Sequence, residues 1–139
     1  MPFTYSILPD QNLVRQTLWG IITATDLRQM SIAMGGDPHY RNRMDIIADF
    51  RQATAQISYD EMMEFARFVA DNGEIGKEAI VVSGQLEFGM ARMFEQLTEH
   101  TFLRRDLKVF FDMDAAELWI SNASATQPSA LGTGRNAKA

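Results

Sequence analysis

Strand-like and helix-like segments alternate along this chain, and that alternation constrains its fold more than any other feature. Two β-rich runs come first, and each later strand-like run is followed by a helix-like segment, which makes the order ββαβαβαβα. Such alternation favours parallel strands joined by right-handed crossovers. The sequence therefore predicts an α/β domain with a five-stranded, mixed, mainly parallel sheet flanked by about four helices.

The expected strands are apolar runs rich in β-branched and aromatic residues. They are residues 3–8, 13–20, 44–50, 78–83 and 107–111. The turn-favouring segment Pro9-Asp10-Gln11-Asn12 separates the first two runs and predicts a hairpin. The third and fourth runs are mostly apolar, as expected for strands that are covered on both faces.

The expected helices have recognisable start and stop signals. Thr23 with Asp26 can open the first helix, and the capping box Ser58-Tyr-Asp-Glu61 opens the second, which continues to about Asn72 before Gly73. The pair Gly35-Gly36 is expected to end the first helix, because glycine adopts the left-handed conformation favoured there. Two further helices are expected, one over 86–100 and one starting at Asp112 or Asp114.

Composition indicates one soluble globular domain followed by a tail. The chain has 139 residues, of which 46% are hydrophobic and 22% charged, enough for a single core. From Asn122 onward the residues are mainly Ser, Ala, Thr, Gly and Gln, with Leu131 as the one large aliphatic. Such a segment buries too little surface to offset its ordering entropy. We therefore expect a folded domain over 1–121 and a flexible tail over 122–139.

Several classes of function are disfavoured by what the sequence lacks. It has no cysteine, no apolar run long enough to span a membrane and no secretion signal at its start, which predicts a cytoplasmic protein. A net charge of −5 argues against nucleic-acid binding. The only histidines, His39 and His100, have no second histidine at metal-ligand spacing. No nucleotide-binding, phosphate-binding or nucleophile-elbow motif occurs, so we expect no cofactor, no metal, no catalytic residue and no enzymatic activity.

Two charged residues, Asp49 and Arg51, fall near the end of the expected third strand. They share one face of that strand, and the carboxyl ends of parallel strands commonly hold ligands. The alternative is structural: Asp49 accepts hydrogen bonds from loop amides or pairs with a nearby arginine.

The start of the third helix, Phe88-Gly-Met-Ala-Arg-Met-Phe94, offers further candidates. Gly89 is unfavourable in a helix and is explained either by close packing or by the approach of a ligand. Arg92 lies near the positive end of the helix dipole, where an anion or carboxylate partner would offset its charge. Met62, Met90 and Met93 would add an adaptable apolar wall, unless they are ordinary core residues.

These candidates together suggest a hypothetical pocket between the sheet edge and the third helix. Its ligand-binding residues would be Asp49, Arg51, Gly89, Arg92, Met62, Met90 and Met93. Because guanidinium groups bind carboxylate and phosphate well, the pocket would suit a molecule with an anionic head and an apolar body, such as a fatty acid or another lipid.

The same regions carry a resemblance. The matching motifs are Asp37-Pro-x-Tyr-Arg41, Asp49-Phe-Arg-x-Ala-Thr54, Ile57-Ser58, Ala79-Ile-Val-Val82, Phe88-Gly-Met-Ala-Arg-Met-Phe94 and Val109-Phe-x-Asp112 with Ala116 and Trp119. Through them the sequence resembles the SpoIIAA-like family, small and mostly uncharacterised bacterial proteins also described as STAS/CRAL-TRIO-like. The likeness covers nearly all of residues 3–121. It implies a mixed sheet flanked by helices and no established enzymatic activity.

The resemblance implies two kinds of function. STAS domains regulate through protein partners, whereas CRAL-TRIO domains carry apolar ligands. We expect the former, a non-enzymatic binding or regulatory domain with an unknown protein partner or a second copy of itself in a homodimer. The alternative is a small carrier or sensor of an apolar anionic ligand. Related regulators carry a phosphorylatable serine at the start of this helix, which makes Ser58 a possible phosphorylation site. Because Ser58 lacks the preceding aspartate and following glycine found there, we favour an N-cap instead.

Overall fold

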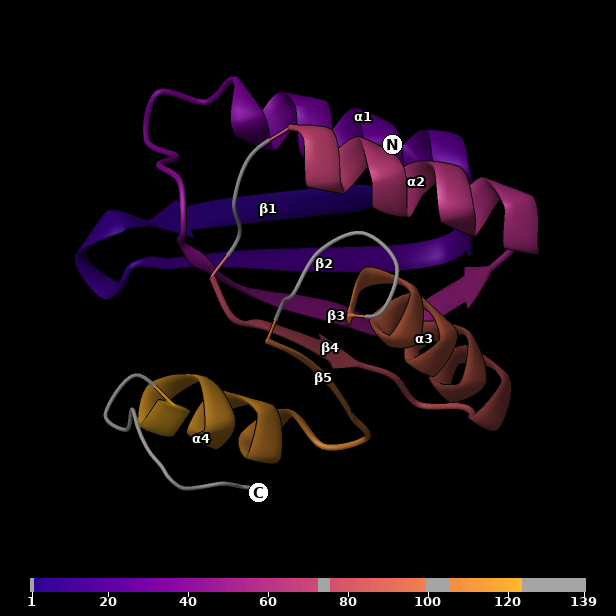
Figure 1. Ribbon diagram of the computed structural model, residues 1–139. Helices are drawn as coiled ribbons and strands as arrows, with labels where there is room; N and C mark the ends of the chain where they lie inside the picture. The colour runs from indigo at the N-terminus through magenta and orange to yellow at the C-terminus, as the bar shows by residue number, and fades with distance from the viewer. Residues whose placement is uncertain (1, 73–75, 100–105, 124–139) are drawn as a thin grey trace.

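The computed structural model describes residues 2–72, 76–99 and 106–123. Its strands are β1 (Phe3–Leu8), β2 (Leu13–Ile22), β3 (Asp45–Ala55), β4 (Glu78–Val81) and β5 (Leu107–Phe110). Its helices are α1 (Ala24–Gly35), α2 (Tyr59–Asp71), α3 (Gln85–Leu97) and α4 (Met113–Ala123), with a 3₁₀ turn, η1, at Pro9–Gln11. The predicted α/β class and the order ββαβαβαβα are confirmed (Figure 1).

The five strands lie side by side in the order in which they occur in the chain. β1 is antiparallel to β2, and the pairs β2–β3, β3–β4 and β4–β5 are parallel, so the predicted mixed, mainly parallel sheet is confirmed. Each parallel connection advances by one strand in the same direction. Right-handed crossovers of this kind place their helices on one face of the sheet, where α1, α2 and α3 lie.

Side chains alternate along the strands between the two faces of the sheet, and both faces are buried in part. On the face covered by α1, α2 and α3, buried residues of β2, β3 and β4 pack with Met34, Phe88 and Phe94. On the opposite face, Leu13, Ile47, Ala79 and Val81 pack against Ala116 and Ile120 of α4. We call these two sides of the sheet the cavity face and the α4 face.

The predicted hairpin is present, and its turn is tight. Asn12 adopts a left-handed conformation with φ of 55°, and its N–H donates to the Pro9 carbonyl at 3.1 Å. Asparagine tolerates this conformation better than most residues. Leu8 and Leu13 face each other at the end of the hairpin, and β2 then runs two residues farther than predicted, to Ile22.

Both predicted helix starts are confirmed as capping boxes. Thr23 Oγ1 accepts from the Asp26 N–H at 3.3 Å, while Asp26 accepts from the Thr23 N–H at 2.9 Å. The predicted left-handed glycine at the end of α1 is wrong, because Gly35 is helical and Gly36 has a right-handed conformation with φ of −90°. Gly36 donates to the Ile32 carbonyl, so the helix closes without a left-handed residue.

The C-terminal elements differ slightly from the prediction. α3 ends at Leu97, and α4 continues to Ala123, so Asn122 is helical rather than the first residue of a tail. Gly73, His100, Leu131 and the segment 124–139 lie outside the described residues.

Candidate ligand-binding cavity

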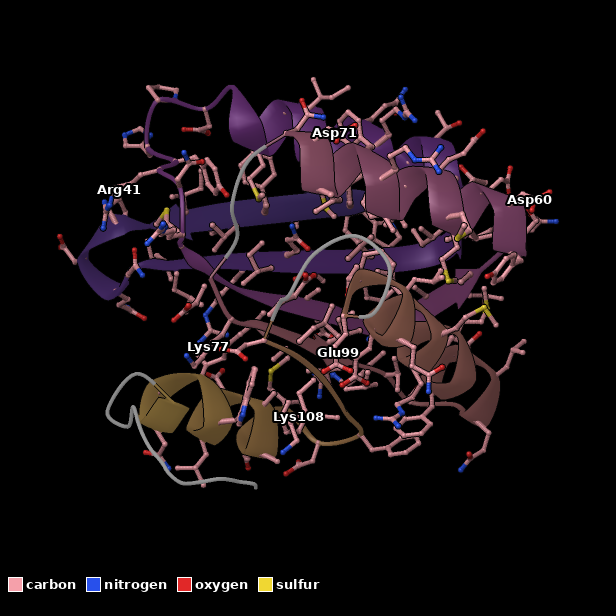
Figure 2. The ribbon with its side chains drawn as sticks, viewed as in Figure 1. Arg41, Asp60, Asp71, Lys77, Glu99 and Lys108 are labelled. Atoms are coloured by element: carbon pink, nitrogen blue, oxygen red, sulfur yellow. The ribbon has the colours of Figure 1, made fainter. Side chains whose placement is uncertain are left out.

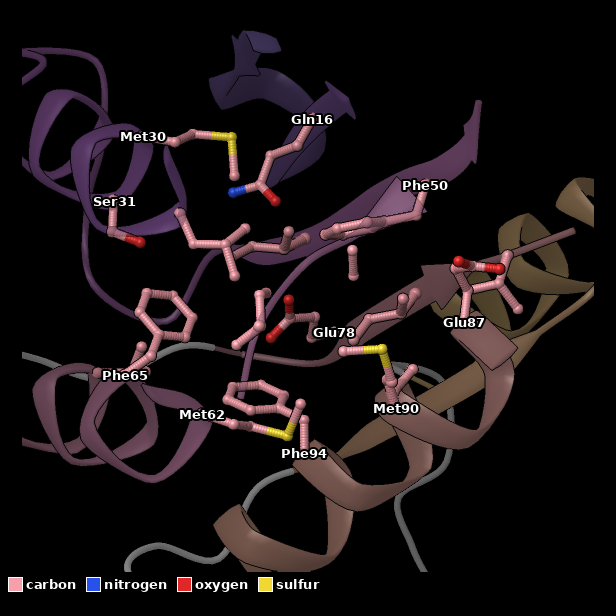
Figure 3. A pocket seen from close by; sticks show the side chains of 18 of the residues that line it. Gln16, Met30, Ser31, Phe50, Met62, Phe65, Glu78, Glu87, Met90 and Phe94 are labelled. Atoms are coloured by element: carbon pink, nitrogen blue, oxygen red, sulfur yellow. The ribbon is translucent and has the colours of Figure 1, made fainter. Parts of the chain in front are cut away.

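An apolar cavity of about 110 Å³ lies between the cavity face of the sheet and helices α1, α2 and α3 (Figure 3). Its wall contains aromatic rings and thioethers that belong to elements far apart in the sequence. These are Phe50 of β3, Phe65 of α2, Phe94 of α3 and the methionines Met30, Met34, Met62 and Met90. The wall is therefore adaptable in shape, since methionine side chains are flexible and polarisable.

Helical and strand periodicities explain why these residues meet. Met62, Phe65 and Val69 are spaced three and four residues apart on α2, which places them on one face. Met90 and Phe94 repeat that spacing on α3. The rings of Phe65 and Phe94 stack across the two helices with centroids 5.8 Å apart, and so form one side of the cavity.

Gln16 is the unusual residue of this wall. It lies on β2 between Val14 and Leu18, both fully buried on the same face, and its own side chain is only 6% exposed. The carboxamide extends from β2 into the cavity (Figure 3). Among the described residues, its Nε2 donates only to the thioether sulfur of Met34, at 3.5 Å. Within the described residues, no donor pairs with its Oε1, so a buried amide oxygen faces the cavity.

The remaining polar wall residues are acceptor-rich. The carboxylates of Glu78 and Glu87 and the hydroxyl of Ser31 join Gln16 in the lining. The lining contains no lysine, arginine or histidine as far as the described chain extends. The described part of the wall therefore combines apolar groups with a few hydrogen-bond acceptors.

Only some of the ligand-binding residues predicted from the sequence meet in this cavity. Met62 and Met90 line it. Met93 does not line the cavity. Its side chain is 38% exposed and lies on the solvent side of α3.

Asp49 and Arg51 lie on the α4 face of the sheet, away from the cavity. They alternate on β3 with Phe50, which faces the cavity. The Arg51 guanidinium binds the Asp49 carboxylate through Nε at 2.9 Å and Nη2 at 2.8 Å. These hydrogen bonds hold the pKa of Asp49 below its usual value. The arginine pairing considered as the structural alternative is therefore present.

Gly89 and Arg92 also lie outside the cavity. A Cβ at Gly89 would meet no atom of the described residues within 4 Å, so neither close packing nor the approach of a described backbone segment explains this glycine. Arg92 pairs with Glu95 of the same helix at 2.9 Å. Burial raises the pKa of the Glu95 carboxyl, and the nearby guanidinium of Arg92 opposes that shift. In the part of the chain that the structure describes, the predicted residues therefore do not line one common pocket.

Ser58 is an N-cap, as predicted. Its Oγ accepts from the Glu61 N–H at 3.1 Å, and the Glu61 carboxylate accepts from the Ser58 N–H at 2.8 Å. The hydroxyl is thus engaged at the start of α2, with Asp60 and Glu61 already supplying negative charge there.

In the described ranges, no three His, Cys, Asp or Glu side chains come together as a metal site. No helix among the described residues is both long and apolar enough to cross a membrane. His39 contacts Asp37 through Nδ1 at 3.1 Å in an exposed loop.

The architecture matches a solved structure. An uncharacterised protein of the DUF3478 family with a SpoIIAA-like fold, from Shewanella loihica PV-4, superposes on this chain with a TM-score of 0.58. The match covers 84% of this chain and 92% of that one. The fold of this chain is SpoIIAA-like.

This likeness concerns the fold, because the two sequences are 17% identical. No protein-family model matches the sequence, and a search among curated proteins finds no match. Within the SpoIIAA-like fold of this chain, the cavity wall lies on elements that the sequence analysis had placed correctly. Gln16 was missed, although a polar residue that interrupts the buried positions Val14 and Leu18 was a visible signal.

Proposed function

We propose that this chain is a non-enzymatic binding domain whose cavity takes a small, mostly apolar molecule with one polar group. The observation that carries the proposal is the Gln16 carboxamide, buried in an apolar wall and directed into the cavity. Leaving a buried amide without a good partner costs about 1–3 kcal/mol. A ligand that bonds to Oε1 would recover that energy. The non-enzymatic part rests on the sequence, which has none of the common catalytic motifs.

The volume favours a small ligand over a lipid. An engineered cavity of about 150 Å³ in another protein holds one benzene molecule, whereas pockets for larger ligands measure about 300–1,000 Å³. At about 110 Å³, this cavity suits a molecule of roughly one ring. This size does not favour the fatty acid considered in the sequence analysis.

Methionine methyl signals in NMR spectra offer a direct test. Protein labelled with ¹³C at its nine methionine methyl groups would be titrated with benzyl alcohol and with toluene. We expect both probes to shift the signals of Met30, Met34, Met62 and Met90 and to leave exposed Met93 unchanged. If no lining signal moves with either probe, the cavity holds only water and the proposal is wrong.

The Gln16→Met variant tests the role of the carboxamide. Methionine keeps the length of the side chain and removes its hydrogen-bonding groups, so benzyl alcohol should lose about two- to tenfold in affinity. Toluene should bind the variant equally well or better. Gln52→Met, at an exposed position of β3, is the matched control and should change neither affinity. Unchanged discrimination in Gln16→Met would contradict this role.

A second observation favours action through protein partners. Beyond the part covered by α4, the α4 face of β2 leaves Trp19 41% and Ile21 63% exposed on the same side of the sheet. We propose this apolar surface as the place where a regulatory partner binds, a second copy of the chain being the simplest such partner. Exposed aromatic and aliphatic side chains of this kind are common at protein interfaces.

Sedimentation measurements test the homodimer. If Ile21 lies at its interface, wild-type protein should self-associate with rising concentration and Ile21→Lys should remain monomeric. Ile32→Lys, on the outer side of α1 at a similar 58% exposure, is the control and should behave as wild type. Monomeric wild-type protein at all concentrations would remove the homodimer and leave a different protein as the partner.

A further inference from the structure

The chain carries on α4 an apolar surface that matches the exposed side chains of β2. Resting on the proposed function, we propose that two copies associate face to face, with the outer side of α4 in each copy against Trp19 and Ile21 of the other. Such an arrangement is isologous, because the contact between α4 and β2 occurs twice about one two-fold axis. The surface already proposed for a partner is then covered by the last helix of a second copy.

Leu118 is the apolar residue on the outer side of α4. Ala116 and Ile120 are buried between this helix and the sheet. Residues two positions apart on a helix are rotated by about 200°, so Leu118, which lies between them in the sequence, points away from the sheet. Its side chain is 60% exposed. Because α4 lies on the opposite side of the sheet from α1, α2 and α3 (Figure 1), its outer side is turned away from those helices.

Trp19 and Ile21 form the surface that would receive this helix. They alternate along β2 with Leu18 and Ile22, which are fully buried on the cavity face, so both point to the α4 face. The outer side of α4 and these two side chains therefore lie on the same side of the sheet, and one face of a second copy reaches both. Bringing Leu118 against them removes apolar area from water, which favours association.

The charges beside the two apolar surfaces are complementary. On α4, Asp114 is exposed and lies four residues before Leu118, one turn away on the same side of the helix. On the sheet, Trp19 pairs with Gln52, and the neighbouring Arg51 keeps 44% of its side chain exposed within its ion pair. A guanidinium has more N–H donors than one carboxylate uses. We therefore place Asp114 of one copy opposite Arg51 of the other.

Opposite charges introduced at the contact test the arrangement by analytical ultracentrifugation. Ile21→Lys and Leu118→Glu each place a charge against an apolar side chain of the second copy, so each variant alone should stay monomeric where wild-type protein associates. The double variant with Ile21→Lys and Leu118→Glu sets lysine against glutamate at both contacts. We expect it to associate at least about tenfold more tightly than either single variant. Both positions are more than half exposed, so the substitutions leave the core intact.

The double variant with Ile21→Lys and Ile32→Glu is the matched control. It introduces the same two charges, but Ile32 is 58% exposed on α1, on the other side of the sheet, so this variant should stay monomeric. Equal rescue in both double variants, or rescue in neither, would overturn the arrangement. Wild-type association in Leu118→Glu alone would also overturn it, while monomeric Ile21→Lys protein would still support the surface on β2. Wild-type protein that is monomeric at all concentrations would instead remove the homodimer itself.

The contact between Asp114 and Arg51 has its own test. Asp114→Asn keeps the size of the side chain and removes its charge, so association should weaken by about two- to fivefold. The difference from wild type should shrink at high salt, because exposed ion pairs are screened. Asp60→Asn, in the first turn of α2 on the other side of the sheet, is the control and should associate as wild type. Unchanged association in Asp114→Asn, or an equal loss in both variants, would overturn this contact.

Discussion

Arg15 of β2 and Glu117 of α4 form an ion pair across 102 positions of sequence, with Nη2 and Oε1 2.6 Å apart. The pair stands at the border of the surface that α4 covers, since the next residues on this face of β2, Thr17 and Trp19, are exposed. The hydrogen bond from Arg15 holds the pKa of Glu117 below its ordinary value of 4.5. This ion pair therefore links α4 to β2 and marks where the exposed part of the sheet begins. Figure 2 shows the described side chains on the ribbon.

The lowered pKa of Glu117 predicts a pH-dependent contribution to stability. A carboxyl group whose pKa is lower in the folded state stabilises the fold above its unfolded pKa, and this contribution is lost as the pH falls through the folded value. Both side chains are over a third exposed, so Glu117→Gln should cost under about 1 kcal/mol at pH 7. Urea denaturation at pH 7 and pH 3 should show the variant less stable only at pH 7. An equal deficit at both values would contradict the ion-pair explanation.

The N-cap of α2 predicts a specific pattern of substitution at Ser58. Ser58→Ala removes the acceptor for the Glu61 N–H and should reduce the free energy of unfolding by about 0.5–2 kcal/mol. Ser58→Asp should be tolerated, because aspartate caps helices equally well. Denaturant titration measures both effects. A phosphorylation switch would instead leave both variants near wild-type stability and change partner binding in Ser58→Asp.

Gly89 predicts a stabilising substitution. It lies in the interior of α3, where glycine is up to about 1 kcal/mol less favourable than alanine, and an added Cβ would meet open space. Gly89→Ala should therefore raise the free energy of unfolding by up to about 1 kcal/mol and leave probe binding unchanged. A destabilised or binding-deficient variant would show that the glycine has a role in a complex or ligand site.

Gly76 predicts the opposite sign for the same change. A Cβ there would lie 2.5 Å from Asp45 Oδ1 and 2.7 Å from the Arg43 carbonyl oxygen. Asp45 cannot easily withdraw, because its Oδ1 accepts from the Lys77 N–H at 2.9 Å. We expect Gly76→Ala to reduce stability by about 1–3 kcal/mol. A neutral result in thermal denaturation would mean that this segment shifts without penalty.

Much of this fold follows from local signals in the sequence. Turn residues at 9–12, the capping pairs Thr23–Asp26 and Ser58–Glu61, and the apolar runs of the strands act over a few residues. Capping and turn hydrogen bonds join residues a few positions apart. The element order and most boundaries could therefore be predicted without knowing which strands pair with each other. The extra residues of β2 and β3 could not be predicted in this way. They pair with each other as far as Ile22 and Ala55, and the length of a strand depends on how far its neighbour offers hydrogen-bonding partners.

The candidate site depended on information that no segment contains by itself. The sequence determined that Asp49 and Arg51 share a face and that Met62 and Met90 lie on apolar helix stripes. Only the tertiary structure decided which face the crossover helices cover, and that choice separates the Asp49–Arg51 pair from the methionines. It also brought Gln16 of β2 into the same cavity wall as Glu78 of β4. The physical reason is that strand order and crossover direction assign each alternating side chain to one layer, and these are properties of the assembled sheet.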